Sequence, residues 1–153
     1  EPPPLGGELS EVPVELRADT RMIDNVPASG CRGLLVNQRV RTVFDGLGLD
    51  NLQYYAARLV DRKAGPLPSP FWVANIVGTR ACVDHERSEL DCYPDGQVRF
   101  IERLALKPVP DAPRIFRLAG FLPVIIVSDG VRDALVEHGI TGFAFYRPEE
   151  FSL

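Results

Sequence analysis

Hydrophobic and polar residues follow the same order in two separate segments of this chain. Residues 34–49 read LLVNQRVRTVFDGLGL, and residues 125–140 read IIVSDGVRDALVEHGI. Each segment begins with three aliphatic residues and ends with glycine and one more aliphatic residue. In between, apolar residues fall on one face of a 3.6-residue period. The pattern predicts a strand followed by a short amphipathic helix in both segments, as in a duplicated unit.

The residues at the two helix ends support this interpretation. Asn37 and Ser128 stand where each helix would begin, and their short side-chain oxygens are suited to accept a free backbone N–H of the first turn. Gly48 and Gly139 stand where each helix would end in a left-handed residue. An apolar, aromatic run follows each glycine, so each copy is predicted to be a strand–helix–strand unit.

The rest of the chain predicts strands separated by proline-rich turns. Residues 98–107 alternate between apolar and polar positions, as in a strand with one buried face. The fold class is therefore α+β, with a mixed or antiparallel sheet and two short helices. We expect residues 1–33, which are rich in proline and glycine, to form an N-terminal arm with at most an edge strand, and residues 34–153 to form one domain. The predicted strands are Val12–Leu16, Leu34–Val36, Leu52–Val60, Phe71–Val77, Val98–Lys107, Ile115–Leu118, Ile125–Val127 and Phe143–Tyr146.

Composition narrows the class of protein. The 153 residues suit one soluble domain, and they contain no apolar run of the roughly 20 residues that would cross a membrane. The net charge of −4 argues against a nucleic-acid-binding protein and suits a basic partner. Three cysteines, an odd and low number, favour a reducing compartment, so we expect a cytoplasmic location. The chain opens with Glu1 rather than Met, which leaves room for a removed leader.

The densest polar segment is CVDHERSELDC, residues 82–92. Cys82, His85 and the neighbouring carboxylates are zinc-ligand types, but the segment lacks the second paired motif that closes a tetrahedral site. Cys82 or Ser88 beside His85 is a possible nucleophile–base pair, but no nucleophile-elbow motif surrounds Ser88. His138 falls on the last turn of a helix, where histidine commonly serves the carbonyl groups at the helix end. We therefore predict no catalytic residues, no metal site and no cofactor.

Several motifs spread over about residues 34–146 carry a resemblance to a known family. They are the segment Leu34–Val43 with Asn37 at the cap, the pair Asp84 and Ser88, the run Ile115–Leu118, then Ser128, Asp129, Val131 and Leu135, and finally Gly139-Ile140-Thr141-Gly142-Phe143 with Phe145. Through these motifs the chain resembles a bacterial immunity-protein family assigned to polymorphic-toxin loci, first catalogued as a domain of unknown function and abundant in myxobacteria.

The resemblance implies a function without enzymatic chemistry, in which the protein binds a cognate toxin and neutralises it as an inhibitor. It implies a toxin partner, while the net charge and the lack of a membrane-length apolar run predict that neither nucleic acid nor a membrane is a partner. The residues themselves suggest where that partner binds, because an acidic segment speeds encounter with a basic toxin. The candidate partner-binding residues are Asp84, Glu86, Glu89, Asp91 and Asp95. Two other functions stay open: an adaptor or chaperone-like domain for a secreted effector, and a metal-binding or hydrolytic enzyme that uses residues 82–92.

Overall fold

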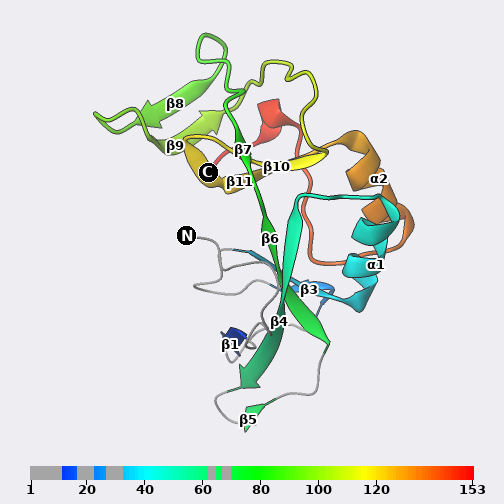
Figure 1. Ribbon diagram of the computed structural model, residues 1–153. Coiled ribbons are helices and arrows are strands. Elements are labelled where there is room, and N and C mark those ends of the chain that lie inside the picture. The colour runs from blue at the N-terminus through cyan, green and yellow to red at the C-terminus, as the bar shows by residue number, and fades with distance from the viewer. Residues whose placement is uncertain (1–11, 17–22, 27–32, 62–64, 67–69) are drawn as a thin grey trace.

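The main sheet runs through the lower half of the molecule in Figure 1. The computed structural model describes residues 12–16, 23–26, 33–61, 65–66 and 70–153. In this part of the chain the main sheet has the order β1-β4-β6-β3-β2, with β5 added to β4. β1 pairs in parallel with β4 and the other pairings are antiparallel, so the sheet is mixed as predicted. The strands are β1 (Val12–Leu16), β2 (Asn25–Val26), β3 (Leu34–Asn37), β4 (Leu52–Asp61), β5 (Gly65–Pro66) and β6 (Phe71–Ile76).

Two smaller sheets form the upper half. One has the order β11-β10-β7, and the other is the two-stranded hairpin β8–β9. The hairpin projects on the side of the molecule away from the helices, as Figure 1 shows. The strands are β7 (Thr79–Arg80), β8 (Glu89–Cys92), β9 (Val98–Arg103), β10 (Ile115–Leu118) and β11 (Phe121–Val127).

The helices α1 (Gln38–Gly46) and α2 (Asp129–Glu137) follow β3 and β11, which confirms the strand–helix part of both copies. Asn37 accepts the N–H of Val40, and Ser128 accepts that of Val131, so both predicted N-caps are confirmed. Both helices end in a Schellman motif around a glycine with positive φ: 65° at Gly48 and 62° at Gly139. Short caps at both ends hold helices of only nine residues, which alone would be marginal in water.

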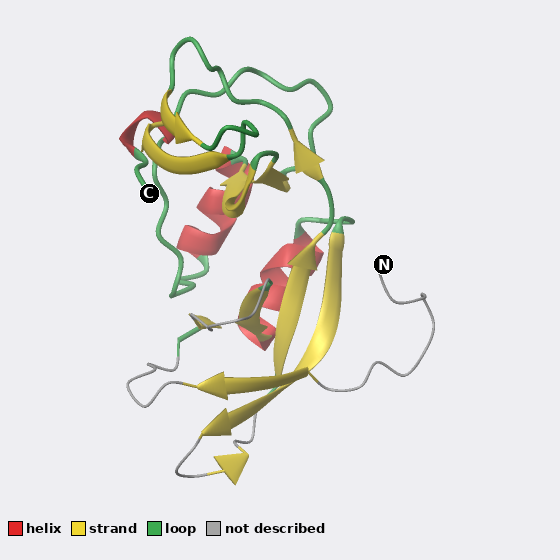
Figure 2. Ribbon diagram, turned by 90° about the vertical axis from the view of Figure 1, so that its left-hand side faces the viewer, coloured by secondary structure: helices red, strands yellow, loops and turns green. Residues whose placement is uncertain are grey.

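Three clusters of buried side chains form the core. Successive residues of β3 and β6 point to opposite faces of the main sheet, which separates the first two clusters. On one face, Val36 and Ala74 pack against α1 and α2, which lie together in Figures 1 and 2. On the other face, Leu35 and Val73 pack with Leu59. The third cluster lies between the hairpin and β10–β11 and includes Val98, Ile101, Leu104, Phe116, Leu118 and Val124.

The strand predicted after the second helix does not form. Residues 143–146 have no strand structure, although the equivalent run after α1 forms β4. The aromatic rings pack on the helix layer instead: Phe143 lies 6.5 Å from Phe44, edge to face, and stacks on Phe145 at 6.0 Å between ring centroids. The run therefore supplies core side chains without a neighbouring strand to pair with, and only the strand–helix part of the unit occurs twice. After it comes the short 3-10 helix η1 (Pro148–Glu150).

The alternation predicted for residues 98–107 is also wrong. β9 ends at Arg103, and its buried residues are Val98 and Ile101, three positions apart. The cause is two irregularities in the pairing with β8. Asp91 lies opposite Phe100 and Cys92 opposite Val98, so Arg99 has no residue opposite it, and Glu102 is passed over in the same way. Each such bulge turns two successive side chains toward solvent.

Four other predicted strands form within one residue of their expected ends, whereas the strand predicted at Ile125–Val127 begins four residues earlier, at Phe121. Val12–Leu16 is an edge strand, as expected. Most of the predicted N-terminal arm, residues 1–33, lies outside the described residues. Within the described part of the chain, neither helix is long and apolar enough to cross a membrane.

Candidate functional site

The most highly connected polar group in the described structure is the carboxylate of Asp24, which is only 6% exposed. It accepts hydrogen bonds from the Asn37 amide at 2.7 Å and from the backbone N–H and hydroxyl of Thr141 at 2.8 and 3.0 Å. The guanidinium of Arg39 pairs with it at 3.0 Å. One buried acid thus joins the strand before β3, the start of α1 and the turn after α2.

Hydrogen bonds decide the charge state of Asp24. Burial alone would raise the pKa of its carboxyl group, but donation by Thr141 and Asn37, with the charge of Arg39, outweighs burial and lowers that pKa below the ordinary value. Asp24 is therefore a carboxylate at neutral pH. Since both carboxylate oxygens accept hydrogen bonds from this chain, the group is a structural joint.

The joint extends through the turn after α2. Gly142 has φ +90°, and a Cβ atom there would overlap the carbonyl of Asn25. Arg39 also donates to the carbonyl of His138 at 2.8 Å. The His138 ring nitrogen lies 2.7 Å from the carbonyl oxygen of Ala134, which confirms the role expected for a histidine on the last helical turn. The residues around this turn therefore serve the fold.

The reactive residue types of segment 82–92 are also used by the fold. Cys82 is buried, and burial raises the pKa of its thiol, so the reactive thiolate is disfavoured. The Ser88 hydroxyl accepts the N–H of Ala105 at 2.8 Å and donates to its carbonyl at 3.1 Å. His85 is exposed. The geometry gives no activated nucleophile, and the described residues contain no group of three or more metal-ligating side chains.

The structure places the five candidate acidic residues around the β8–β9 hairpin, in three kinds of position. Asp84 caps its turn, because its side chain accepts the N–H groups of Glu86 and Arg87 at 3.1 and 3.3 Å. Asp95 does the same for Gln97 at the hairpin turn, at 3.0 Å. The remaining three divide between ion pairs and solvent: Glu89 pairs with Arg103 at 2.8 Å, Asp91 pairs with Arg99, and Glu86 is exposed.

Sequence reasoning missed the aromatic residues of the hairpin. Tyr93 and Phe100 are 51% and 55% exposed, which is unusual for large aromatic side chains. The guanidinium of Arg99 lies 5.8 Å from the Tyr93 ring and 5.4 Å from the Phe100 ring. We call Tyr93, Arg99 and Phe100 the tip cluster. The bulge at Arg99 was the missing signal, since strict alternation would have separated Arg99 from Phe100 across the sheet.

Comparison with known proteins decides the family. The model of an immunity protein family, Imm11, matches residues 3–150. The chain belongs to this immunity protein family. No curated protein matches it. The family expected from the sequence is confirmed, and the match extends over the N-terminal segment as well as the expected residues 34–146.

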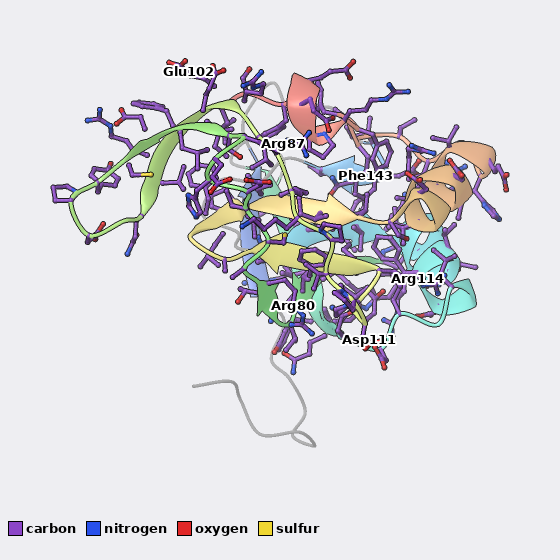
Figure 3. All side chains as sticks on the ribbon, turned by 90° about the horizontal axis from the view of Figure 1, so that it is seen from above. Arg80, Arg87, Glu102, Asp111, Arg114 and Phe143 are labelled. Carbon is purple, nitrogen blue, oxygen red and sulfur yellow. The ribbon has the colours of Figure 1, made fainter. Side chains whose placement is uncertain are left out.

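The immunity protein also has a groove beside its C-terminal segment. The groove encloses about 640 Å³ and is lined mainly by β11, by α2 and by residues 142–151. Figure 3 shows Phe143 within this side of the molecule, far from Glu102 on the hairpin. Its lining mixes apolar side chains with Asp129, Arg132, Arg147 and Glu150, and Arg132 is already paired with Asp129 at 3.1 Å. The groove therefore offers no concentration of charge toward a partner, unlike the hairpin.

Proposed function

We propose that this immunity protein binds a cognate bacterial toxin domain and neutralises it by non-covalent association, without catalysing a reaction. The family match over residues 3–150 carries this proposal. The site chemistry supports it. Asp24 and Ser88, the polar groups best placed to act chemically, are both engaged within the chain. What the molecule offers to a partner is a rigid surface.

The proposed contact region is the acidic segment around the hairpin. Asp84, Glu86, Glu89, Asp91 and Asp95 all lie there, and we propose that a basic toxin domain approaches this side. Asp84 and Asp95 both cap turns, so we assign to both a part in holding the loops in shape. Glu86 and Asp95 are also exposed, so they are available for steering. We further propose a cytoplasmic location, because Cys82 and Cys92 are free thiols of a kind common in reducing compartments.

The test is protection from toxicity. A candidate toxin domain, chosen from the genes adjacent to that of this chain, is placed under an inducible promoter in a bacterial host, with and without the full chain. We expect the full chain to restore growth and to co-purify with the toxin as a complex of fixed stoichiometry. A chain that neither binds the toxin nor restores growth refutes the proposal.

The same experiment separates the adaptor function. An adaptor or chaperone-like domain would bind the toxin yet leave its activity intact, so the toxin would remain lethal although the complex forms. A catalytic function would instead destroy or modify the toxin at substoichiometric amounts of this chain. Mass spectrometry of the toxin after mixing at a one-to-ten ratio distinguishes that outcome, since non-covalent inhibition leaves the toxin mass unchanged.

A further inference from the structure

The hairpin together with the loop before it carries most of the net charge of the chain. Residues 84–103 contain six acidic residues and three arginines, a net charge of −3, in a chain whose net charge is −4. Two of the acids, Glu89 and Asp91, are neutralised by arginines of β9. Glu86, Asp95 and Glu102 are exposed and form no ion pair within the described structure. Figure 3 shows Glu102 pointing away from the body of the molecule.

The tip cluster lies in the same segment, residues 84–103, as these three exposed acids, which we call the acidic rim. Asp91 holds the guanidinium of Arg99, which lies near both aromatic rings. The arginine is therefore already ordered before a partner arrives, so less side-chain entropy is lost on binding. Tyrosine and arginine are also the residue types enriched among the few residues that dominate binding energy at protein interfaces.

The hairpin is held firmly enough to present this cluster. A two-stranded hairpin alone is at best marginally stable in water. Here Val98 and Ile101 anchor one face in the third core cluster. The outer edge of β9 pairs with the C-terminal residue, because Ile101 and Leu153 exchange backbone hydrogen bonds of 2.7 and 2.8 Å. At its base, Ser88 holds the chain against Ala105.

We propose that the tip cluster is the anchor of the toxin interface, and that the rim of Glu86, Asp95 and Glu102 steers a toxin domain with a basic surface onto it. Charge complementarity decides the occupant: an apolar centre within an acidic rim fits a partner whose basic residues surround an apolar depression. This inference rests on the proposed function, because it names the surface by which the toxin is bound. Asp91 is a positioning residue, which acts through Arg99.

The two parts of the surface should affect different rate constants. Steering by rim charges changes the association rate, whereas a desolvated anchor changes the dissociation rate. We expect Tyr93→Ala with Phe100→Ala to weaken binding at least ~30-fold, mainly by faster dissociation. We expect Glu86→Gln with Asp95→Asn and Glu102→Gln to slow association roughly tenfold at low salt and to flatten its salt dependence, with little change in dissociation.

The measurement is stopped-flow or surface-based kinetics of the full chain with the toxin domain against which it protects in the growth experiment. Two variants act as matched controls. Tyr146→Ala removes an aromatic side chain that is 63% exposed but lies on the C-terminal segment. Asp50→Asn with Asp111→Asn and Glu137→Gln neutralises three exposed acids outside the hairpin. Equal thermal melting of all variants shows that folding is unchanged.

A second readout needs no substitution in the surface. Cys92 is an exposed thiol next to Tyr93, whereas Cys82 is buried. In a Cys31→Ser background, saturating toxin should slow the alkylation of Cys92 at least about tenfold, because an interface of standard size covers about 800 Å² on each partner. This readout also reports the hairpin in its native composition.

The outcomes separate the two proposals. If the wild-type chain does not bind the toxin, the proposed function fails. If it binds, but both hairpin variants keep wild-type rate constants and Cys92 stays fully reactive, the function stands and the hairpin assignment is overturned. A loss of binding in Tyr146→Ala equal to that of the tip variant would likewise overturn it, since the groove side would then hold the interface.

Discussion

Replacing Asp24 tests whether one buried carboxylate holds the three parts of the fold together. In Asp24→Ala the Asn37 amide and the N–H and hydroxyl of Thr141 lose their acceptor, while Arg39, whose side chain is 57% exposed, can be rehydrated. Hydrogen bonds to a charged group are worth about 1.5–3 kcal/mol each, and donors left buried without an acceptor cost about 1–3 kcal/mol.

The ion pair with Arg39 contributes little, because the arginine side chain is largely exposed. We therefore expect Asp24→Ala to lower the free energy of unfolding by about 3 kcal/mol, near the lower limit for breaking a buried charged pair. For a domain of this size the melting temperature should fall by about 6–12 °C. Asp24→Asn, which keeps the volume of the side chain, should lose part of that amount.

The pH dependence follows from the lowered pKa of Asp24. A carboxylate whose pKa is lowered by folding stabilises the folded state at pH values above its unfolded-state pKa of about 4. That stabilisation is lost as the pH falls through its folded-state pKa. The difference in stability between wild type and Asp24→Asn should thus stay constant from about pH 5 to 8 and narrow below about pH 4. Urea unfolding across this range measures it, with exposed Asp50→Asn as the control. Equal unfolding midpoints of Asp24→Ala and wild type at pH 7 would refute the assignment of Asp24 as a joint.

Three further substitutions test the packing. Gly142→Ala places a Cβ atom against the carbonyl of Asn25 in a residue with φ +90°, so it should lower the free energy of unfolding by at least about 2 kcal/mol. Gly46→Ala places its Cβ atom in open space in α1, so it should raise the free energy of unfolding by about 0.5–1 kcal/mol. Equal melting temperatures of the two variants would contradict the reasoning. Tyr54→Phe removes a buried hydroxyl that has no hydrogen-bond partner within the described structure, so unfolding should show unchanged stability or a gain of up to about 1 kcal/mol. Burial raises the pKa of Tyr54 to about 12, so the free energy of unfolding of wild type should fall as the pH rises from about 10 toward 12, where the phenol ionises more readily in the unfolded chain. Tyr54→Phe should lack this fall. An equal fall in Tyr54→Phe would assign the pH dependence to another group.

Local signals predicted the parts of the fold that depend on neighbours in the sequence. Asn37 and Ser128 were identifiable as N-caps because a cap bonds to residues three positions away. Gly48 and Gly139 were identifiable because a left-handed helix end is a one-residue property. Both helices and the strands that precede them follow from these signals.

The same reasoning could not predict contacts between residues that are distant in the sequence. Asp24 and Thr141 are separated by 117 positions, and no periodic pattern connects them. Phe143–Tyr146 has the composition of a strand but no neighbouring strand, so packing on Phe44 decides its structure. The bulges of β9 depend on the register with β8, which a single-strand pattern does not contain. The tip cluster exists only because of that register, so the most exposed aromatic surface of the hairpin was hidden from sequence analysis.

The residues that identify the family and the residues proposed to select the toxin occupy different parts of the molecule. Thr141 and Gly142, from the motif that carries the resemblance, lie inside the joint with Asp24 and Asn25. Asp84 and Ser88, the part of the resemblance nearest the hairpin, cap and hold its base. A fold maintained in this way leaves the hairpin tip free to vary, because its side chains contact solvent rather than core. Under the proposed function, such a division lets the surface that binds a toxin differ while the scaffold stays the same.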